Sequence, residues 1–393
     1  MTLSRRQWLA RFGAATTAFA AAGPGLSLAR APTERRLLVV MLRGAADGLA
    51  LIPPYGEPTY PGLRGPLALP APGSAGGIER IDGLFGVHPS APWLAARFRE
   101  RTALAVHAVA TPYRARSHFD GQDVLESGSA GVAGLRSGWL NRTLVAFAPT
   151  TADRAVALAT NTPLILQGDA PVLTWSPSRL PEQSEDTLQR LAALYAEDAF
   201  LADRLEQALE ARSIAGAMEG RGRQQLKPTL RRAARFLQQP DGARIAFVDS
   251  GGWDTHANQG SVAGQFARHL TQLDAGLAGF ASTLGALWKQ TAVLVMTEFG
   301  RTVRVNGTRG TDHGTGAVAL LVGGSVAGGR VLGDWPGLAR ANLYEGRDLK
   351  PTTDLRALIK TVLLDHLGVA EAATESTVFP ASAAVRPLES VFI

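Results

Sequence analysis

The chain has 393 residues, of which 46% are hydrophobic and 19% are charged, a composition typical of a globular protein with enough residues for a large core. It contains no cysteine, which excludes disulfide bonds and thiolate metal sites. The formal net charge is +6, but Arg5, Arg6, Arg11 and Arg30 lie in an N-terminal segment without acids, so the rest carries +2 and has no basic block typical of nucleic-acid binding.

The N-terminal segment has the features of an export signal. Its stretch SRRQWL resembles the twin-arginine motif, and a mildly apolar, Ala-rich run follows. A plain basic N-terminus or a membrane anchor is the alternative, but the run is too short and weakly apolar to span a membrane. We therefore expect residues 1–31 to be a twin-arginine signal peptide. The mature protein would then be periplasmic or secreted, delivered by the twin-arginine export machinery, with no stable membrane span.

Five apolar runs predict the strands of a mostly parallel sheet. Continuous runs of this length are typical of strands that are buried on both faces. They cover residues 37–42, 102–110, 243–256, 291–302 and 316–324.

Helical patterns lie between and after these runs. They cover residues 184–211, with Ser184 as a candidate N-cap, 264–290 and 352–369. The Pro- and Gly-rich segment 55–85 is expected to be a long loop or a covering insertion. Strands that alternate with helices predict an α/β fold. We expect residues 32–393 to form one domain with a helical insertion around 180–240.

Acids and histidines gather where the apolar runs begin or end. Ligands of open α/β sheets bind beyond the carboxyl ends of the strands, so residues far apart in sequence are expected to meet there. These residues are Asp47 after the first run, Ser117, His118 and Asp120 after the second, Asp254 and His256 after the third, Glu298 at the end of the fourth, and Asp312 and His313 just before the fifth.

Imidazole and carboxylate groups together are the ligands of a mixed metal site. They suit zinc, manganese, calcium or magnesium, and without thiolates such a site is expected to be catalytic rather than a closed zinc knot. Two ions held about 4 Å apart could clamp both oxygens of a phosphoryl or sulfuryl displacement. We therefore predict one or two divalent ions.

Some of these positions also have a structural interpretation. Asp47, in GAADG, could be a turn residue that bonds its own backbone. In GGWDTH, Asp254 or Thr255 could cap a following helix, although the adjoining glycines favour a site. Glu298, in TEFGRT, could cap a helix or pair with Arg301.

The stretch SHFDGQD could begin a helix, with Ser117 as its cap and Asp120 as the first-turn acid that the helix dipole favours. A helix N-terminus also suits a nucleophile or a bound anion, so the two interpretations are compatible. Arg114, Arg116 and Arg301 lie beside the candidate loops and could bind an anionic substrate through paired hydrogen bonds.

The remaining four histidines do not fit this pattern. His88 lies in an expected loop, His107 within a strand pattern, and His269 and His366 on predicted helices. We expect structural roles for them, with His107 as a hydrogen-bonded core residue.

The motifs in this order resemble one known family. The stretches LRGAADGL, SHFDGQDVLESG, GGWDTH, TEFGRT, GTDHGTG and DLKPTTDLRALIKTVLLDHLG together resemble the exported proteins grouped as domain of unknown function 1501. That family is placed with the alkaline phosphatase-like superfamily, which includes phosphatases, sulfatases and metal-dependent phosphomutases. The resemblance implies a three-layer α/β sandwich with a mostly parallel central sheet and a two-metal site at the C-terminal strand ends.

The resemblance also implies roles for individual residues. Asp47 matches the superfamily's first metal-binding aspartate. Asp254 and His256 match the Asp and His pair of one metal, at a narrower spacing than usual. Ser117 stands at the place of the nucleophile, and His313 matches a late metal-binding histidine.

Two departures from the superfamily pattern concern the chemistry. Where the superfamily has Asp-His-Gly, this chain has Glu298, Phe299 and Gly300, so one imidazole is missing, and His118 or Asp312 could replace it. The chain also has neither a cysteine nor the Cys/Ser-Pro-Ser-Arg pattern of sulfatases, which disfavours a formylglycine mechanism.

The sequence thus predicts an exported metal-dependent hydrolase of phosphate or sulfate esters that acts on a small anionic ester and has no nucleic-acid partner. Ser117 or a metal-bound water would attack, with Arg116 or Arg301 stabilising the anion. The candidate catalytic residues are Ser117, His118, Arg116 and Arg301, and the candidate ligands are Asp47, Asp120, Asp254, His256, Glu298, Asp312 and His313. The alternative, which Phe299 supports, is a catalytically degenerate binding or envelope-associated protein.

Overall fold

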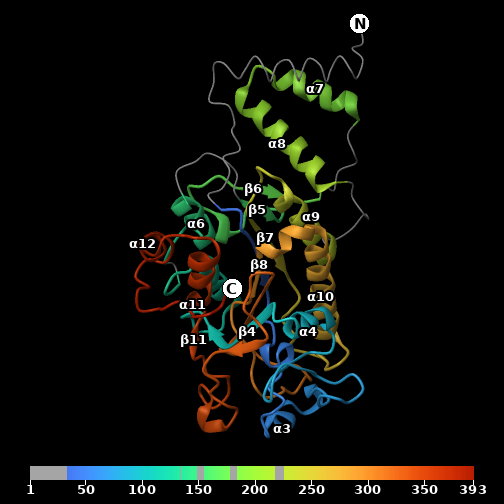
Figure 1. The fold of residues 1–393 in the computed structure, drawn as a ribbon, viewed down its shortest axis with the longest axis vertical. Coiled ribbons are helices and arrows are strands. Elements are labelled where there is room, and N and C mark those ends of the chain that lie inside the picture. The colour runs from blue at the N-terminus through green and yellow to red at the C-terminus, as the bar shows by residue number, and fades with distance from the viewer. Residues whose placement is uncertain (1–32, 133, 148–154, 178–183, 217–224) are drawn as a thin grey trace.

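A computed structural model describes residues 33–393 apart from 133, 148–154, 178–183 and 217–224 (Figure 1). The predicted signal peptide lies outside the described residues. Within them, none of the helices combines the length and the apolar character that crossing a membrane requires.

A nine-stranded sheet forms the centre of the described chain, in the order β10-β4-β9-β8-β1-β7-β5-β6, with β11 paired to β4. Only β9 runs antiparallel to its neighbours, β8 and β4. The strands are β1 (Arg36–Leu42), β4 (Ala103–Ala110), β5 (Ala155–Leu158), β6 (Leu173–Trp175), β7 (Ile245–Ser250), β8 (Thr291–Met296), β9 (Ala317–Gly323), β10 (Arg330–Leu332) and β11 (Thr353–Asp354). The predicted, mostly parallel sheet is confirmed. The sequence did not reveal β5, β6, β10 and β11, which are too short to show a pattern.

Of the helices in the described residues, some cover both faces of the sheet and others lie at its ends. They are α2 (Gly48–Leu51), α3 (Tyr60–Arg64), α4 (Pro92–Arg99), α5 (His118–Ser127), α6 (Trp139–Phe147), α7 (Glu185–Tyr195), α8 (Ala199–Ala215), α9 (Leu226–Gln238), α10 (Gln265–Leu284), α11 (Leu355–Thr361) and α12 (Glu371–Ala373). Figure 1 shows α6 and α11 on one side of the strands and α4, α9 and α10 on the other.

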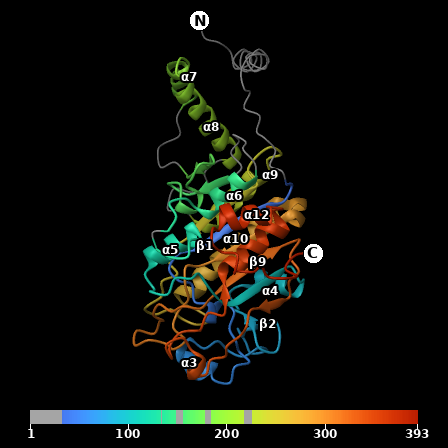
Figure 2. The same cartoon turned by 90° about the vertical axis from the view of Figure 1, so that its left-hand side faces the viewer.

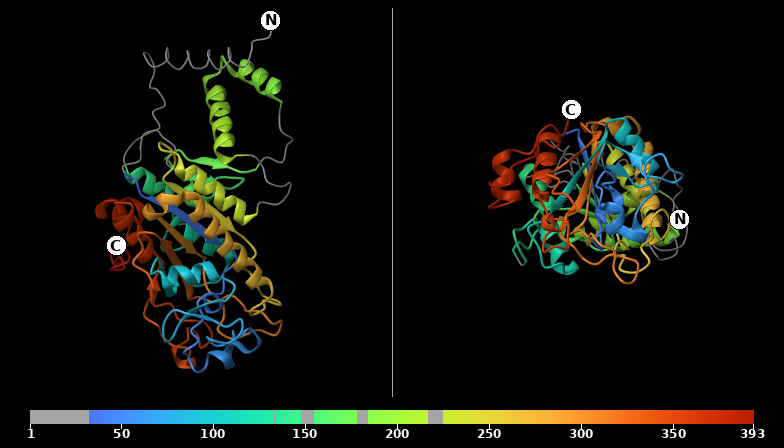
Figure 3. Two further views of the ribbon diagram at one scale, coloured as in Figure 1. Left: turned by 45° about the vertical axis from the view of Figure 1, so that its right-hand side comes forward. Right: turned by 90° about the horizontal axis from the view of Figure 1, so that it is seen from below.

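The alternation of side chains along β1 divides the core in two. Leu38 and Val40 pack with the layer of α4, α9 and α10, whereas Leu37, Val39 and Met41 pack with the layer of α6 and α11. The right-hand view of Figure 3, in which the molecule is seen from below, shows the strands between these two groups of helices. The predicted three-layer arrangement is therefore confirmed.

The helical pattern at 184–211 forms two helices rather than one. Ser184 caps α7 as predicted, its side chain accepting from the Thr187 N–H, but the chain then breaks and Asp198 caps α8. Asp198 competes for the backbone N–H groups of Phe200 and Leu201, which starts a new helix there. Both helices extend beyond the β5–β6 end of the molecule, away from α3 (Figure 2). The proposed insertion around 180–240 stays a prediction, since α9 lies within the core layer.

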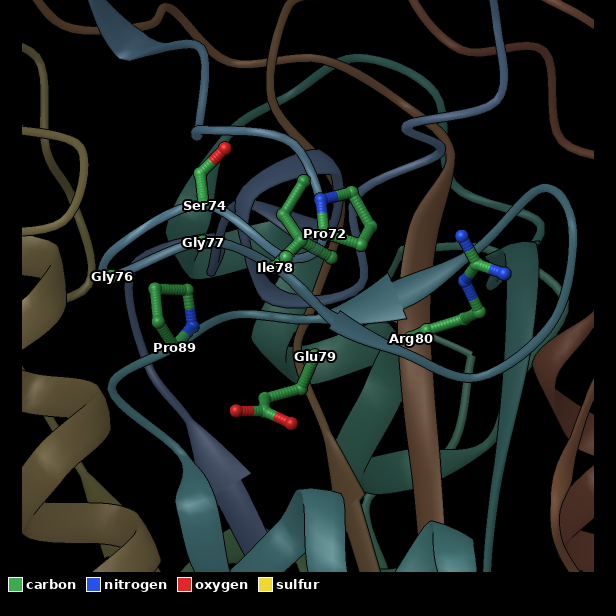
Figure 4. A pocket seen from close by; sticks show the side chains of 9 residues that line it. Pro72, Ser74, Gly76, Gly77, Ile78, Glu79, Arg80 and Pro89 are labelled. Carbon is green, nitrogen blue, oxygen red and sulfur yellow. The ribbon is translucent and has the colours of Figure 1, made fainter.

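The segment 55–85 holds α3 and leads into a small second sheet of β2 (Glu79–Arg80) and β3 (Gly86–Val87). Its residues 72–74 and 76–80, with Pro89, border a surface hollow of about 610 Å³ (Figure 4). That lining is mostly Pro, Gly and Ser, and its one acid, Glu79, pairs with Arg99. The hollow is therefore distinct from the candidate site.

Candidate metal centre

One edge of the sheet collects the predicted site residues. The parallel strands β1, β4, β7 and β8 end at this edge. Because β9 is antiparallel to them, it begins there. This direction explains why Asp312 and His313 precede their strand while Asp254 and Glu298 follow theirs.

Four side chains converge at this edge. His118 is the first residue of α5, Asp254 and His256 follow β7, and His313 precedes β9. The His256 Nε2 lies 2.9 Å from the His313 Nε2, and the Asp254 Oδ1 lies 3.1 Å from the first and 3.3 Å from the second. The His118 Nε2 is 3.5 Å from the Asp254 Oδ2. Ligands 2.0–2.1 Å from a shared tetrahedral ion lie about 3.3 Å apart. Candidate ligand atoms of His118, Asp254 and His313 all lie within 4.8 Å of one another, which suits a single ion, and His256 lies beside Asp254 and His313.

Each imidazole is held through its Nδ1. The three contacts are His118 to the Glu298 Oε1 at 2.7 Å, His256 to the Asp312 Oδ1 at 3.2 Å, and His313 to the Arg116 carbonyl oxygen at 2.9 Å. Ionised carboxylates and carbonyls only accept hydrogen bonds, so each Nδ1 carries a proton and directs the Nε2 of its ring toward the Asp254 carboxylate. The His256 and His313 Nε2 atoms, 2.9 Å apart, need a proton or a cation beside them.

Glu298 is buried and is ionised by its surroundings. Burial by itself would raise the pKa of Glu298. Hydrogen bonds from His118, from the Gln122 amide at 3.1 Å and from the Gly44 N–H at 2.9 Å outweigh burial and lower it. Thr297 donates to the other oxygen at 2.9 Å. All these groups are donors, so Glu298 acts as an acceptor that orients His118, as carboxylates beside metal-binding histidines commonly do.

The two exposed carboxylates are also ionised. Burial of Asp254 would raise its pKa, but the Arg301 guanidinium, 2.8 Å from the Asp254 Oδ1, and the neighbouring His256 and His118 together outweigh burial and lower it. The Asn306 amide, 2.9 Å from the Asp312 Oδ1, is the main cause of the lowered pKa of Asp312. Both carboxylates therefore carry negative charge toward the histidines at neutral pH.

The surroundings shift the pKa values of His313 and His118 in opposite directions. Burial lowers the pKa of His313, which favours the neutral ring that ligation requires. The hydrogen bond with Glu298 raises the pKa of His118. The His118 Nε2 is shielded from solvent and, among the described residues, has no hydrogen-bond partner. A buried nitrogen aimed at a carboxylate fits a cation between the two.

Phe299 forms one wall of the centre. Its ring stacks on that of His118, with 5.0 Å between centroids, and lies 5.2 Å from that of His313. Phe299 thus packs on the plane of His118, which brings an imidazole to the cluster from α5.

Asp47 has different partners. It caps α2 by accepting from the Leu49 N–H, its Oδ2 accepts from Gln259 at 2.6 Å, and it pairs with buried Arg64. Both of its oxygens are therefore engaged by donors from the chain, and Asp47 stands outside the group of four.

Two residues of the SHFDGQD stretch lie beside the cluster. The Asp120 carboxylate accepts from the Tyr113 hydroxyl at 3.2 Å. Ser117 occupies the N-cap position of α5, but its side chain makes no capping hydrogen bond. Of the two, Ser117 is the one with a hydroxyl that the helix end does not use.

Of the three arginines predicted to bind an anion, Arg114 donates to the Tyr113 carbonyl and the other two are engaged by acids. The Arg116 guanidinium contacts Asp348 and Glu345, and Arg116 serves the centre through its carbonyl oxygen. The Arg301 side chain is buried against Asp254. Both arginines therefore support the ligands.

Sequence reasoning missed several supporting residues. Gln122 had a signal, because it lies one turn after His118 on the same face of a predicted helix. Arg64, Gln259 and Asn306 had none, since each lies in a loop or covering segment without a periodic pattern.

Residues 88–377 match the model of a family described as "Protein of unknown function (DUF1501)". Curated proteins include no match to the sequence. Among solved structures, the C-terminal periplasmic domain of EcEptC from Escherichia coli in complex with Zn is similar with a TM-score of 0.43 and 10% identity, over 92% of this chain and 93% of that chain. The PsFucS1 sulfatase from Pseudoalteromonas sp. is similar with a TM-score of 0.42 and 11% identity, over 91% of this chain and 71% of that chain. The phosphonate monoester hydrolase of Agrobacterium radiobacter is similar with a TM-score of 0.39 and 12% identity, over 86% of this chain and 74% of that chain.

Proposed function

The chain belongs to the family described as "Protein of unknown function (DUF1501)", and from that premise we propose that it is an exported, metal-dependent hydrolase of phosphate or sulfate esters. One observation supports the proposal most directly: three imidazoles held through Nδ1 present their Nε2 atoms around the Asp254 carboxylate. His118, Asp254, His256 and His313 are the proposed ligands.

The donor set narrows the choice of metal. Three nitrogens and one carboxylate suit zinc or manganese, whereas calcium and magnesium prefer oxygen ligands. When bound, such an ion polarises an ester oxygen and lowers the pKa of a coordinated water toward neutrality. We therefore propose zinc or manganese.

The exposure of the centre favours a substrate site over a closed structural one. The side chains of Asp254 and His256 are 41% and 44% exposed, so a small anionic ester can approach the ligands. The Ser117 hydroxyl, beside His118, is the proposed nucleophile, with water as the alternative. The N–H groups that begin α5 would favour the negative charge of the ester.

The test combines metal analysis with activity. The mature chain is purified, its metal content is measured by mass spectrometry, and generic phosphate and sulfate esters are assayed with chelator and after return of zinc or manganese. Asp254→Asn and His313→Gln should lose metal and turnover, whereas His269→Gln, outside the cluster, should keep both. Absence of bound metal and of turnover with every divalent ion would overturn the proposal.

A second candidate function is a catalytically degenerate binding protein that keeps the ion. The specific observation in its favour is that Arg116 and Arg301 are both paired with acids of the chain, which offsets the positive charge that a substrate anion would meet. This candidate predicts stoichiometric metal without turnover of any ester, together with a lower melting temperature in Asp254→Asn.

A further inference from the structure

A buried chain of hydrogen bonds joins Asp254 to Asp47. Arg301 donates from Nη1 to the Asp254 Oδ1 at 2.8 Å and from Nε to the Thr311 hydroxyl at 3.2 Å. The Thr311 hydroxyl donates to the Gln259 Oε1 at 2.8 Å, and the Gln259 Nε2 donates to the Asp47 Oδ2 at 2.6 Å. Arg301, Thr311, Gln259 and Asp47 are each at most 2% exposed.

The chemistry of these groups allows only one donor-to-acceptor order for the hydrogen bonds between Arg301 and Asp47. A guanidinium can only donate, so the Thr311 hydroxyl accepts from Arg301 and its own proton goes to Gln259. The Thr255 hydroxyl also contacts the Gln259 Oε1, at 2.9 Å, which fits an amide whose oxygen faces the two hydroxyls. The Gln259 NH₂ group is therefore directed at Asp47. The opposite orientation of the amide would place its oxygen against the Asp47 carboxylate, and two acceptors cannot form a hydrogen bond.

Asp47 has a cation of its own. Arg64 is 0% exposed and Asp47 is 1% exposed, and the two side chains form an ion pair. A divalent ion at Asp47 would displace the guanidinium and leave a buried charge without a partner, which is strongly unfavourable. A second ion is also unsuited to the Glu298 Oε1, which accepts from three donors of the chain. The Thr297 hydroxyl contacts the Oε2 at 2.9 Å.

We infer that the centre binds one divalent ion per chain, and that Asp47 is a positioning residue which holds Asp254 through Gln259, Thr311 and Arg301. The inference differs from the two-metal site implied by the family resemblance, because Asp47 is already paired with Arg64. The inference rests on the proposed metal centre but not on ester hydrolysis.

Metal stoichiometry tests the first half of the inference. The mature protein is saturated with zinc, and separately with manganese, and its mass is measured under native conditions. One ion per chain is expected. Two ions per chain would overturn the inference and leave the proposed function standing, whereas no bound ion would contradict the proposed metal centre itself.

The variant Gln259→Leu tests the positioning chain. Leucine has a volume similar to that of glutamine but cannot form the hydrogen bonds of Gln259 with Thr311 and Asp47. The ion pair between Asp47 and Arg64 stays in place. The zinc dissociation constant should rise by about 10- to 100-fold, as expected when a group that orients a ligand is lost, with one ion still bound at saturation. A merely structural role would lower the melting temperature and leave the dissociation constant unchanged, which would overturn the inference.

Two further variants complete this test. Gln238→Leu removes an amide that donates to the Thr283 carbonyl at 2.6 Å between α9 and α10, and should leave zinc affinity unchanged. If Gln259→Leu does not fold, Thr311→Val breaks the same chain one link nearer to Asp254 with a side chain of equal size, and the same rise in dissociation constant is expected. Unchanged affinity in Thr311→Val would contradict the inference.

Discussion

At the scale of single residues, the partner of one imidazole nitrogen decides what the other nitrogen can bind. The Arg116 carbonyl cannot donate, so His313 must carry its proton on Nδ1 and offer Nε2 to the centre. Glu298 and Asp312 act in the same way on His118 and His256. Residues outside the proposed ligand set therefore determine which nitrogen each of these histidines presents to the centre.

The variant Glu298→Gln tests whether the hydrogen bond at the His118 Nδ1 determines what the Nε2 of that ring can bind. Glu298 accepts hydrogen bonds from four donors, and a glutamine would present an NH₂ group to some of them. We expect a zinc dissociation constant at least about tenfold higher, measured by competition with a chromophoric chelator. Glu375→Gln, which alters a remote contact with Lys360, is the matched control and should bind zinc normally. Equal affinity in both variants would show that Glu298 does not orient His118.

At the scale of elements, the site depends on close packing between the end of β8 and the start of β9. The N–H of Gly300 donates to the Thr315 carbonyl at 3.0 Å, and the N–H of Gly314 donates to the Gly300 carbonyl at 2.8 Å. A Cβ on Gly300 would lie 1.8 Å from the carbonyl oxygen of Gly316. Glycine is required because the two backbones leave no space for a side chain.

The variant Gly300→Ala should therefore be destabilising. Forcing the two segments apart is expected to cost about 1–3 kcal/mol of unfolding free energy, the usual range for overpacking. Urea denaturation at neutral pH measures it. In Gly307→Ala the added methyl meets nothing within 4 Å, so this control should differ little from the unaltered protein. Similar losses in both variants would contradict the proposed close approach.

At the scale of the whole molecule, buried histidines outside the centre link the stability of the fold to pH. His88, His107 and His366 each place a ring nitrogen against a backbone carbonyl, at 3.0, 3.1 and 2.9 Å. Burial lowers the pKa of each to about 4 from the ordinary 6.5. The expectation that His107 is a hydrogen-bonded core residue agrees with its environment.

We predict a loss of stability between pH 6.5 and about pH 4. In this window the unfolded chain binds protons that the folded chain excludes, so the unfolding free energy falls as the pH falls. Each histidine adds at most about 1.4 kcal/mol per pH unit. Urea denaturation at several pH values, with chelator present to remove metal linkage, measures the slope, and His107→Gln should reduce it. A stability independent of pH across this window would contradict the prediction.

The sequence by itself determined the principal strands and the chemical types at the site. Apolar runs and Gly-flanked acids and histidines are local signals, and a strand buried on both faces must be apolar throughout. The ligands proposed here, His118, Asp254, His256 and His313, were all among the candidates.

Only the tertiary structure decided which candidates meet. An apolar run looks the same whichever way its strand points, so the antiparallel direction of β9, which brings His313 to the site, could not be predicted. A free carboxylate also looks the same in sequence as a paired one. Asp47 is engaged by Arg64, from a segment interpreted only as a covering loop, and by Gln259, from another loop. The role of a polar side chain depends on the donors that reach it, and folding brings those donors from distant parts of the chain.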